Sequence, residues 1–270
     1  MRTSLAILAL VALMGCSPEQ VLQKFSSPED QATARSYVER LRARNFDEIE
    51  KALDPSVRTP NIRETLVKMA SLIPNQEPTS VKIVGAQSFS APDAKTVSTT
   101  FEYSFGDRWL LANVAVRESQ GVRTVVGFHV KPISQSLEVQ NRFTLAGKST
   151  IQYSVLIAAI AAVLLTVYAL VVCIKTKFPR RKWLWILFVV IGLGKLAVNW
   201  TTGEWGIAPL TVQLFSASAV APFYGPWIIA VSLPLGAIVF LFFKRKSLEQ
   251  ALRASTAESD ARKDVARGLP

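Results

Sequence analysis

The segment TVSTTFEYSF, residues 96–105, decides the fold class of the first half of the chain. Its apolar side chains alternate with Thr, Ser and Glu, the period-two pattern of a half-buried β-strand. Gly106 and Asp107 then form a turn, and similar runs lie before and after this segment. We therefore expect four consecutive strands in an antiparallel meander, at 81–89, 96–105, 109–117 and 122–131.

Helix signals precede the strands. Ser27 is suited to an N-cap, Pro28 to the first helical position, and Glu29 and Asp30 to the positive end of the helix dipole. Two shorter helices are expected near 46–53 and 62–73, the second stopped by Pro74. The first helix should bury one apolar stripe, Ala34, Tyr37, Val38 and Leu41. Helices followed by a sheet predict an α+β domain with the helices on one face.

Two stretches resemble the NTF2-like (cystatin-like) superfamily of small α+β domains. The first looks like its helix, short break and helix, and the second like its late strands. The residues that carry the resemblance are Tyr37, Arg44, Asn45, Phe46, Ala52, Leu53, Asp54 and Pro55, then Gly106, Asp107, Arg108, Trp109, Leu110, Leu111, Gly127 and Phe128. The resemblance implies an NTF2-like domain over 28–132. It says little about function, because the superfamily hosts enzymes, ligand pockets and interaction modules.

Catalytic residues are not evident in this domain. Enzymes of the superfamily use Asp, Tyr or His side chains in the cone between sheet and helices. The expected apolar faces of the strands consist of alternate residues within 97–105, 110–116 and 122–130. Tyr103 is the only side chain on these faces with acid or base capacity, and no second such group lies there to act with it. His129 falls on the polar face of its strand. We expect no enzyme, no cofactor and no metal site; the candidates for lining a ligand pocket are Phe101, Tyr103, Trp109 and Phe128.

The amino terminus predicts export. Ten apolar residues, 5–14, follow Arg2 and are too few to span a bilayer as a helix. Leu13, Met14, Gly15 and Cys16 resemble the lipobox of bacterial lipoproteins. That resemblance implies a signal peptide at 1–15, an acylated Cys16 that begins a tether at 16–27, and a domain outside the cytoplasm.

The second half predicts a membrane domain at 151–243. Residues 151–174 include 21 apolar residues among 24 and no charge, which is long enough to span. Five positive charges within 175–182 follow, and the positive-inside rule places them in the cytoplasm. Further spans are expected at 183–200 and 226–243, with an interfacial or re-entrant segment at 207–223, a linker at 133–150 and a cytoplasmic tail at 244–270.

The formal net charge of +11 follows this division. Residues 17–147 hold 16 basic and 15 acidic side chains, whereas residues 148–270 hold 14 and 5. The exported part therefore has no basic patch typical of nucleic-acid binding. Lys195 is the only charge inside an expected span, and Lys195 and Gln213 are the intramembrane polar candidates.

These patterns favour a lipid-anchored, multi-pass protein of the bacterial inner membrane with its soluble domain in the periplasm. The leading hypothesis is a non-catalytic module that binds a ligand or protein, an accessory component of an envelope complex. Its expected partners are membrane lipids and a membrane or periplasmic protein. The alternatives are a small channel or transporter subunit that uses Lys195 and Gln213, and an isomerase-like enzyme centred on Tyr103.

Overall fold

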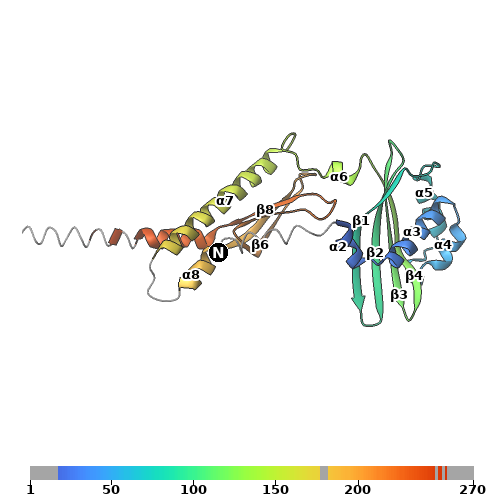
Figure 1. The fold of residues 1–270 in the computed structure, drawn as a ribbon, viewed down its shortest axis with the longest axis horizontal. Coiled ribbons are helices and arrows are strands. Elements are labelled where there is room, and N and C mark those ends of the chain that lie inside the picture. Colours follow the sequence, from blue (N-terminus) through green and yellow to red (C-terminus); the bar gives the residue numbers. More distant parts are fainter. Residues whose placement is uncertain (1–17, 177–181, 247–248, 251–252, 254–270) are drawn as a thin grey trace, which may run out of the picture. The chain divides into compact units, whose positions relative to one another are not determined.

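The computed structural model describes residues 18–176, 182–246, 249–250 and 253 (Figure 1). The chain divides into two compact units. Unit 1 runs to Arg142 and includes Phe223–Gly225; unit 2 holds Phe143–Pro222 and the chain from Pro226 onwards. Cys16 and most of the tail after Lys246 lie outside the described residues.

Unit 1 is an α+β domain with one antiparallel sheet of order β1-β2-β3-β4, which confirms the predicted meander. Figure 1 shows α3, α4 and α5 together on one face of this sheet. The elements are α2 (Pro18–Phe25), α3 (Pro28–Arg42), α4 (Phe46–Ala52), the 3₁₀ turn η2 (Pro55–Val57), α5 (Ile62–Ser71), β1 (Ser80–Ala91), β2 (Ala94–Ser104), β3 (Trp109–Ser119), β4 (Val122–Ile133) and α6 (Leu137–Gln140).

The start of α3 confirms the helix signals in the sequence. The Ser27 hydroxyl accepts a hydrogen bond from the Asp30 N–H, and the Asp30 carboxylate accepts one from the Ser27 N–H, so the two residues form a capping box. All four residues of the predicted stripe are buried, namely Ala34, Tyr37, Val38 and Leu41. The stripe packs with α4, α5 and the sheet in one core.

The centre of this core is a row of aromatic side chains on β2 and the turn after it. Phe101, Tyr103 and Phe105 are each at most 2% exposed. The centroids of successive rings in the row are 6.3 Å apart. Burial of three aromatic side chains stabilises the domain by roughly 1.5–3 kcal/mol each before entropy is counted.

A β-bulge in β4 corrects one sequence expectation. The predicted apolar face of this strand included Val122 and Val126, but Val122 is exposed and Val125 is fully buried. The register with β3 shifts between Ala115 and Val116, so one extra residue enters β4 and reverses its alternation. No hydropathy pattern reveals that insertion.

The opposite face of the sheet is also partly covered. Glu102 and Ser104 belong to the alternation expected to face solvent, but they are 3% and 6% exposed. The Glu102 carboxylate accepts a hydrogen bond from the Leu137 N–H at 2.6 Å, at the start of α6. The covering segment lies inside the linker expected at 133–150, which is therefore partly structured.

Unit 2 combines helices with a second four-stranded antiparallel sheet, of order β6-β5-β8-β7. One end of α7 packs on this sheet through Val155 and Ala159, and its other end packs with Val189 and Phe240. The elements are α7 (Thr150–Lys175), α8 (Lys182–Val189), β5 (Ile191–Asn199), β6 (Trp205–Leu214), β7 (Ala217–Val220), β8 (Ile228–Leu233) and a helix over 235–246.

The three-span helical domain expected from the sequence is therefore wrong. Residues 183–200 form α8 and β5, 207–223 include β6 and β7, and 226–243 are divided between β8 and the last helix. Gly194 adopts φ +73°, which an α-helix does not allow, and Pro234 separates strand from helix. Short apolar runs of this kind fit a strand as well as a buried helix.

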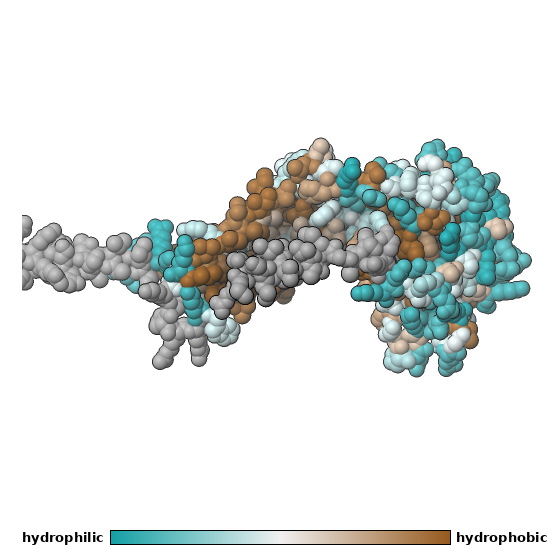
Figure 2. Space-filling view, in the orientation of Figure 1, coloured by the Kyte–Doolittle hydropathy of each residue, from teal (hydrophilic) through white to brown (hydrophobic). Residues whose placement is uncertain are grey.

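Among the described residues, α7 is the one helix long and apolar enough to cross a membrane. Only 28% of its most apolar window is buried, unlike the core helix of a soluble domain. Figure 2 shows hydrophobic surface along this helix. Its exposed side chains include Ile157, Ile160, Leu164, Tyr168 and Ile174.

Trp200 holds the chain just before α7, within the segment 133–150 that the sequence predicts to be a linker. The Trp200 ring stacks on Phe143 at 5.3 Å, and its Nε1 donates to the Thr144 carbonyl at 2.7 Å. Gln152, in the first turn of α7, donates to the Trp200 carbonyl at 2.8 Å. The start of the helix is thus held to the second sheet.

Replacing Gly236 by Ala should destabilise unit 2. A Cβ at Gly236 would lie 1.8 Å from the Phe188 carbonyl oxygen, so α8 and the last helix would have to separate. Overpacking of this kind costs about 1–3 kcal/mol. The thermal midpoint of the full-length protein in detergent should fall for Gly236→Ala.

Gly206→Ala is the matched control, because its Cβ would meet no atom within 4 Å. Equal midpoints for the two variants would contradict the close contact at Gly236.

Candidate binding sites

The four aromatic residues predicted to line a pocket are all on the sheet of unit 1, but they do not surround a common cavity. Phe101 and Tyr103 are buried in the core, whereas Trp109 and Phe128 are half-buried. Phe128 packs against the same core. Of the four, Phe101 lines a surface groove; the others are not among the residues of that groove.

Tyr103 is enclosed by the core. Its hydroxyl is buried and has no hydrogen-bond partner among the described residues. Burial, and secondarily the charge of Glu39, raise the pKa of the phenol well above its usual range. Tyr103 therefore stays protonated at neutral pH, and no described base forms a hydrogen bond with its hydroxyl.

A groove of about 490 Å³ lies between α2, α3 and β1. We call it the α2–α3–β1 groove. Arg35 on α3 and Lys82 on β1 supply its positive charges, and the Lys82 ammonium is 3.7 Å from the Glu138 carboxylate. Its wall also includes Leu22, Pro28, Gln31, Ala32, Val81, Ile83 and Phe101.

Arg35 is exposed, and no described carboxylate forms an ion pair with it. The groove thus combines apolar side chains with an available guanidinium, which suits a partner that is partly apolar and partly acidic. The sequence pattern did not identify the groove, because its residues come from two helices and one strand. One local signal existed: Arg35 directly follows Ala34 of the buried stripe and so lies at its edge.

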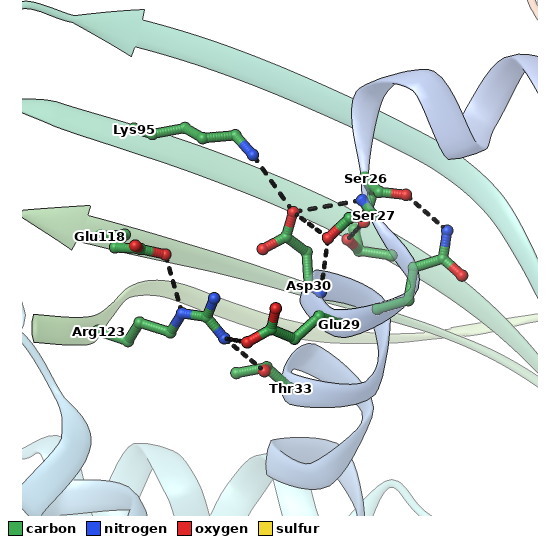
Figure 3. Close-up of polar contacts among 10 residues, drawn as sticks. Ser26, Ser27, Glu29, Asp30, Thr33, Lys95, Glu118 and Arg123 are labelled. Carbon is green, nitrogen blue, oxygen red and sulfur yellow. Dashed lines mark hydrogen bonds and ion pairs between the residues drawn. The ribbon is translucent and has the colours of Figure 1, made fainter. Parts of the chain in front are cut away.

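A polar cluster fastens the start of α3 to the ends of the strands (Figure 3). Arg123 on β4 donates to Glu118 at 2.9 Å and lies 2.9 Å from Glu29. Lys95 on β2 lies 3.4 Å from the Asp30 carboxylate. The charges in this cluster are already paired, so it positions α3 and offers no free group to a ligand.

Asp30 keeps its charge within this cluster. Burial by itself would raise the pKa of the carboxyl, but the two hydrogen bonds from Ser27 and the nearby Lys95 ammonium outweigh burial. The net effect is a pKa below the usual value. The folded state therefore favours ionised Asp30.

Asp54 forms a second satisfied carboxylate site, beside a surface hollow of about 490 Å³. It accepts hydrogen bonds from the Ser56 hydroxyl at 2.6 Å, the Ser56 N–H at 3.0 Å and the Thr124 hydroxyl at 3.0 Å. Arg117 lies 3.5 Å away. The hydrogen bonds from Ser56 chiefly lower the pKa of Asp54 to about 2. The Asp54 N–H also bonds to the Val125 carbonyl, so this residue connects α4 to β4.

The two intramembrane polar candidates lie near one pocket of unit 2. Lys195 lines a pocket of about 550 Å³ between α7 and the second sheet, together with Ser232. Gln213 accepts a hydrogen bond from the Ser232 hydroxyl. Ser232 thus shares the pocket lining with Lys195 and bonds to Gln213, and both candidates lie on β-strands rather than in helical spans.

Within the described residues, the structure assigns no site to the remaining sequence candidates, His129 and Cys173. Cys16 lies outside the described residues, and His129 is exposed on β4. Cys173 is buried in the packing of α7 with Val189 and Phe240. In the described part of the chain, no three His, Cys, Asp or Glu side chains gather as a metal site would require.

No known protein family matches the sequence, and neither a curated protein nor a solved structure shows significant similarity to the chain.

Unit 1 should lose stability in acid through Asp54. The folded pKa is about 2 against an ordinary 3.8. The contribution of Asp54 to the free energy of unfolding is therefore complete above about pH 4 and is lost as the pH falls through about 2. Asp30 shifts in the same direction.

Urea unfolding of the full-length protein in detergent should show this loss in the fluorine NMR signal of 5-fluorotryptophan at Trp109. Asp54→Asn should be less stable than the native protein at pH 7, and its midpoint should change less between pH 4 and pH 2. An identical pH dependence in both proteins would contradict the role of Asp54.

Proposed function

We propose that the chain is a membrane-anchored binding module without catalytic activity, an accessory component of a bacterial envelope complex. In this proposal unit 1 lies in the periplasm and captures a ligand or protein partner. The anchors are α7 and an acylated Cys16.

The filled core of unit 1 is the observation that carries the proposal. In enzymes of the NTF2-like superfamily the chemistry takes place between sheet and helices. Here Phe101, Tyr103 and Phe105 occupy that region with almost no exposed surface. The one titratable side chain among them, Tyr103, has no described hydrogen-bond partner and no access to solvent. This arrangement favours recognition at the surface over catalysis in the interior.

The α2–α3–β1 groove is the binding site that we propose on this surface. Its volume is within the range of small-molecule sites, about 300–1,000 Å³. Its apolar wall with Arg35 at the edge favours a partner that presents apolar groups next to a carboxylate or phosphate.

The exposure of α7 supports the anchoring part of the proposal. Exposed apolar side chains follow the helix along most of its length, as in Ile157, Leu164 and Val171. Water would make such a surface unfavourable, whereas hydrocarbon accepts it. The positive charges that begin at Lys175 then favour a cytoplasmic end for the helix.

A photo-crosslinking amino acid at Arg35 should capture a partner in intact cells. We expect a discrete adduct of the full-length protein when p-benzoylphenylalanine replaces Arg35, and the same adduct from Gln31. Arg35→Glu should weaken the adduct formed from Gln31, because it reverses the charge at the edge of the groove.

Lys51 provides the matched control, since it is an exposed cation on a helix of the same unit outside the groove. Adducts of equal yield from Arg35 and Lys51 would contradict a specific site in the groove.

Loss of both anchors should release the protein from membranes. Cys16→Ser should abolish labelling by an alkyne analogue of palmitate, while α7 keeps the protein resistant to alkaline carbonate. Adding Ile160→Lys and Leu164→Lys places two charges near the centre of α7, at about 2.5–3.5 kcal/mol each. The triple variant should become extractable.

Cys16→Ser with Val139→Lys, an exposed site on α6, should remain in the membrane. If the triple variant is as resistant as this control, α7 is not the anchor.

A further inference from the structure

The pocket that contains Lys195 has a wall of unusual composition. It lies within unit 2, between α7 and strands β5, β6 and β8, and its volume is about 550 Å³. The α7 side presents three small side chains and one leucine, Ala158, Ala161, Ala162 and Leu165. The sheet side presents Leu196, Ile207 and Pro209, with Lys195 as the only charged residue of the lining.

An irregularity of the sheet forms part of the wall of this pocket. The pairing of β5 with β6 shifts register between Leu193 and Lys195, and the pairing of β5 with β8 shifts between Leu193 and Leu196. Gly194 lies at the centre of both shifts with φ +73°. The regular strand is therefore interrupted on both sides at the residue next to Lys195, opposite the small side chains of α7. Bulges of this kind commonly re-aim a side chain at a site.

Lys195 has no anionic partner within the described part of the chain. It is half-buried, and none of the ion pairs or hydrogen bonds of unit 2 includes it. The other polar side chain of the lining, Ser232, donates to Gln213. An anionic group bound in this pocket would form a charge-assisted hydrogen bond with the Lys195 ammonium. The pocket therefore offers apolar volume and one unmatched positive charge.

We propose that this pocket binds an anionic amphiphile, with an acyl chain between α7 and the sheet and a carboxylate or phosphate at the Lys195 ammonium. Single hydrocarbon chains fit an apolar wall without hydrogen-bond requirements, and the charged end of the ligand supplies the missing anion. The proposed membrane attachment is what would supply such a ligand to α7. The site itself does not depend on the α2–α3–β1 groove or on Cys16.

Photo-labelling of the purified full-length protein in a neutral detergent tests the site. The probe is palmitate that carries a diazirine near the end of its chain, and the labelled peptides are identified by mass spectrometry. We expect adducts on α7 and β5 and a loss of about tenfold or more in Lys195→Met, because a hydrogen bond to a charged group is worth about 1.5–3 kcal/mol. Lys195→Arg, which keeps the charge, should retain labelling.

A second pair of variants tests the volume of the pocket. Ala161→Phe should block labelling by filling the space, whereas Val167→Phe, also exposed on α7 but outside the lining, should leave it unchanged. Both proteins are compared by thermal midpoint, so a folding defect is recognised.

Competition identifies the charged group and its source. Displacement of the probe by unlabelled palmitate but not by phosphatidylglycerol would identify a free fatty acid as the ligand. Displacement by both would show that the pocket also accepts an anionic phospholipid. Either result supports the proposal. Equal displacement by hexadecanol and palmitate, or labelling of Lys195→Met at the native level, would overturn it. Because the measurement uses purified protein in detergent, its outcome is independent of the cellular crosslinking at Arg35 and of the carbonate extraction, which test the proposed function.

Discussion

The packing of one strand against three helices is the constraint on which unit 1 depends. The aromatic row of β2 and its turn lies under α3, α4 and α5, and it fixes both the register of the sheet and the face that the helices cover. A shift of β2 by one residue would move Phe101 and Tyr103 to the opposite face and bring Glu102 into the apolar core. The polar cluster at the start of α3 fixes the position of that helix over the sheet, because Arg123 pairs with Glu29 and Lys95 pairs with Asp30.

Local signals in the sequence were sufficient for most of unit 1. The capping residues Ser27 and Asp30, the stripe that contains Val38 and the alternation through Tyr103 each depend on neighbours within a few residues, and the structure agrees with all of them. The bulge near Val125 and the burial of Glu102 could not be predicted in this way. The first depends on pairing with another strand, and the second on a segment 35 residues further along the chain.

Unit 2 shows a different limit of sequence reasoning. Positive charges beside apolar runs predicted three spans, but the runs after Lys182 are short and are interrupted at Gly194 and Pro234. Hydropathy measures how much a run prefers to leave water and not whether it pairs its backbone within a helix or across strands. Lys195 and Gln213 stay candidates only as polar residues, because their isolation among apolar residues does not depend on the type of element, whereas their place in helical spans does. The pocket near Lys195 was not predictable, since it requires α7 and three strands to meet.

The open edges of the second sheet limit which side of α7 could contact lipid in the membrane attachment that we propose. β6 and β7 are the outermost strands of that sheet, and hydrocarbon offers neither donor nor acceptor to an unpaired strand edge. The sheet packs on α7 through the side of Val155 and Ala159, whereas Ile157, Ile160 and Leu164 project elsewhere. In the membrane attachment that we propose, hydrocarbon would therefore contact α7 on one side only, and the other side would need water, headgroups or protein beside the strands. The rotation of the helix about its own axis would then be fixed by the supply of hydrogen bonds as much as by apolar area.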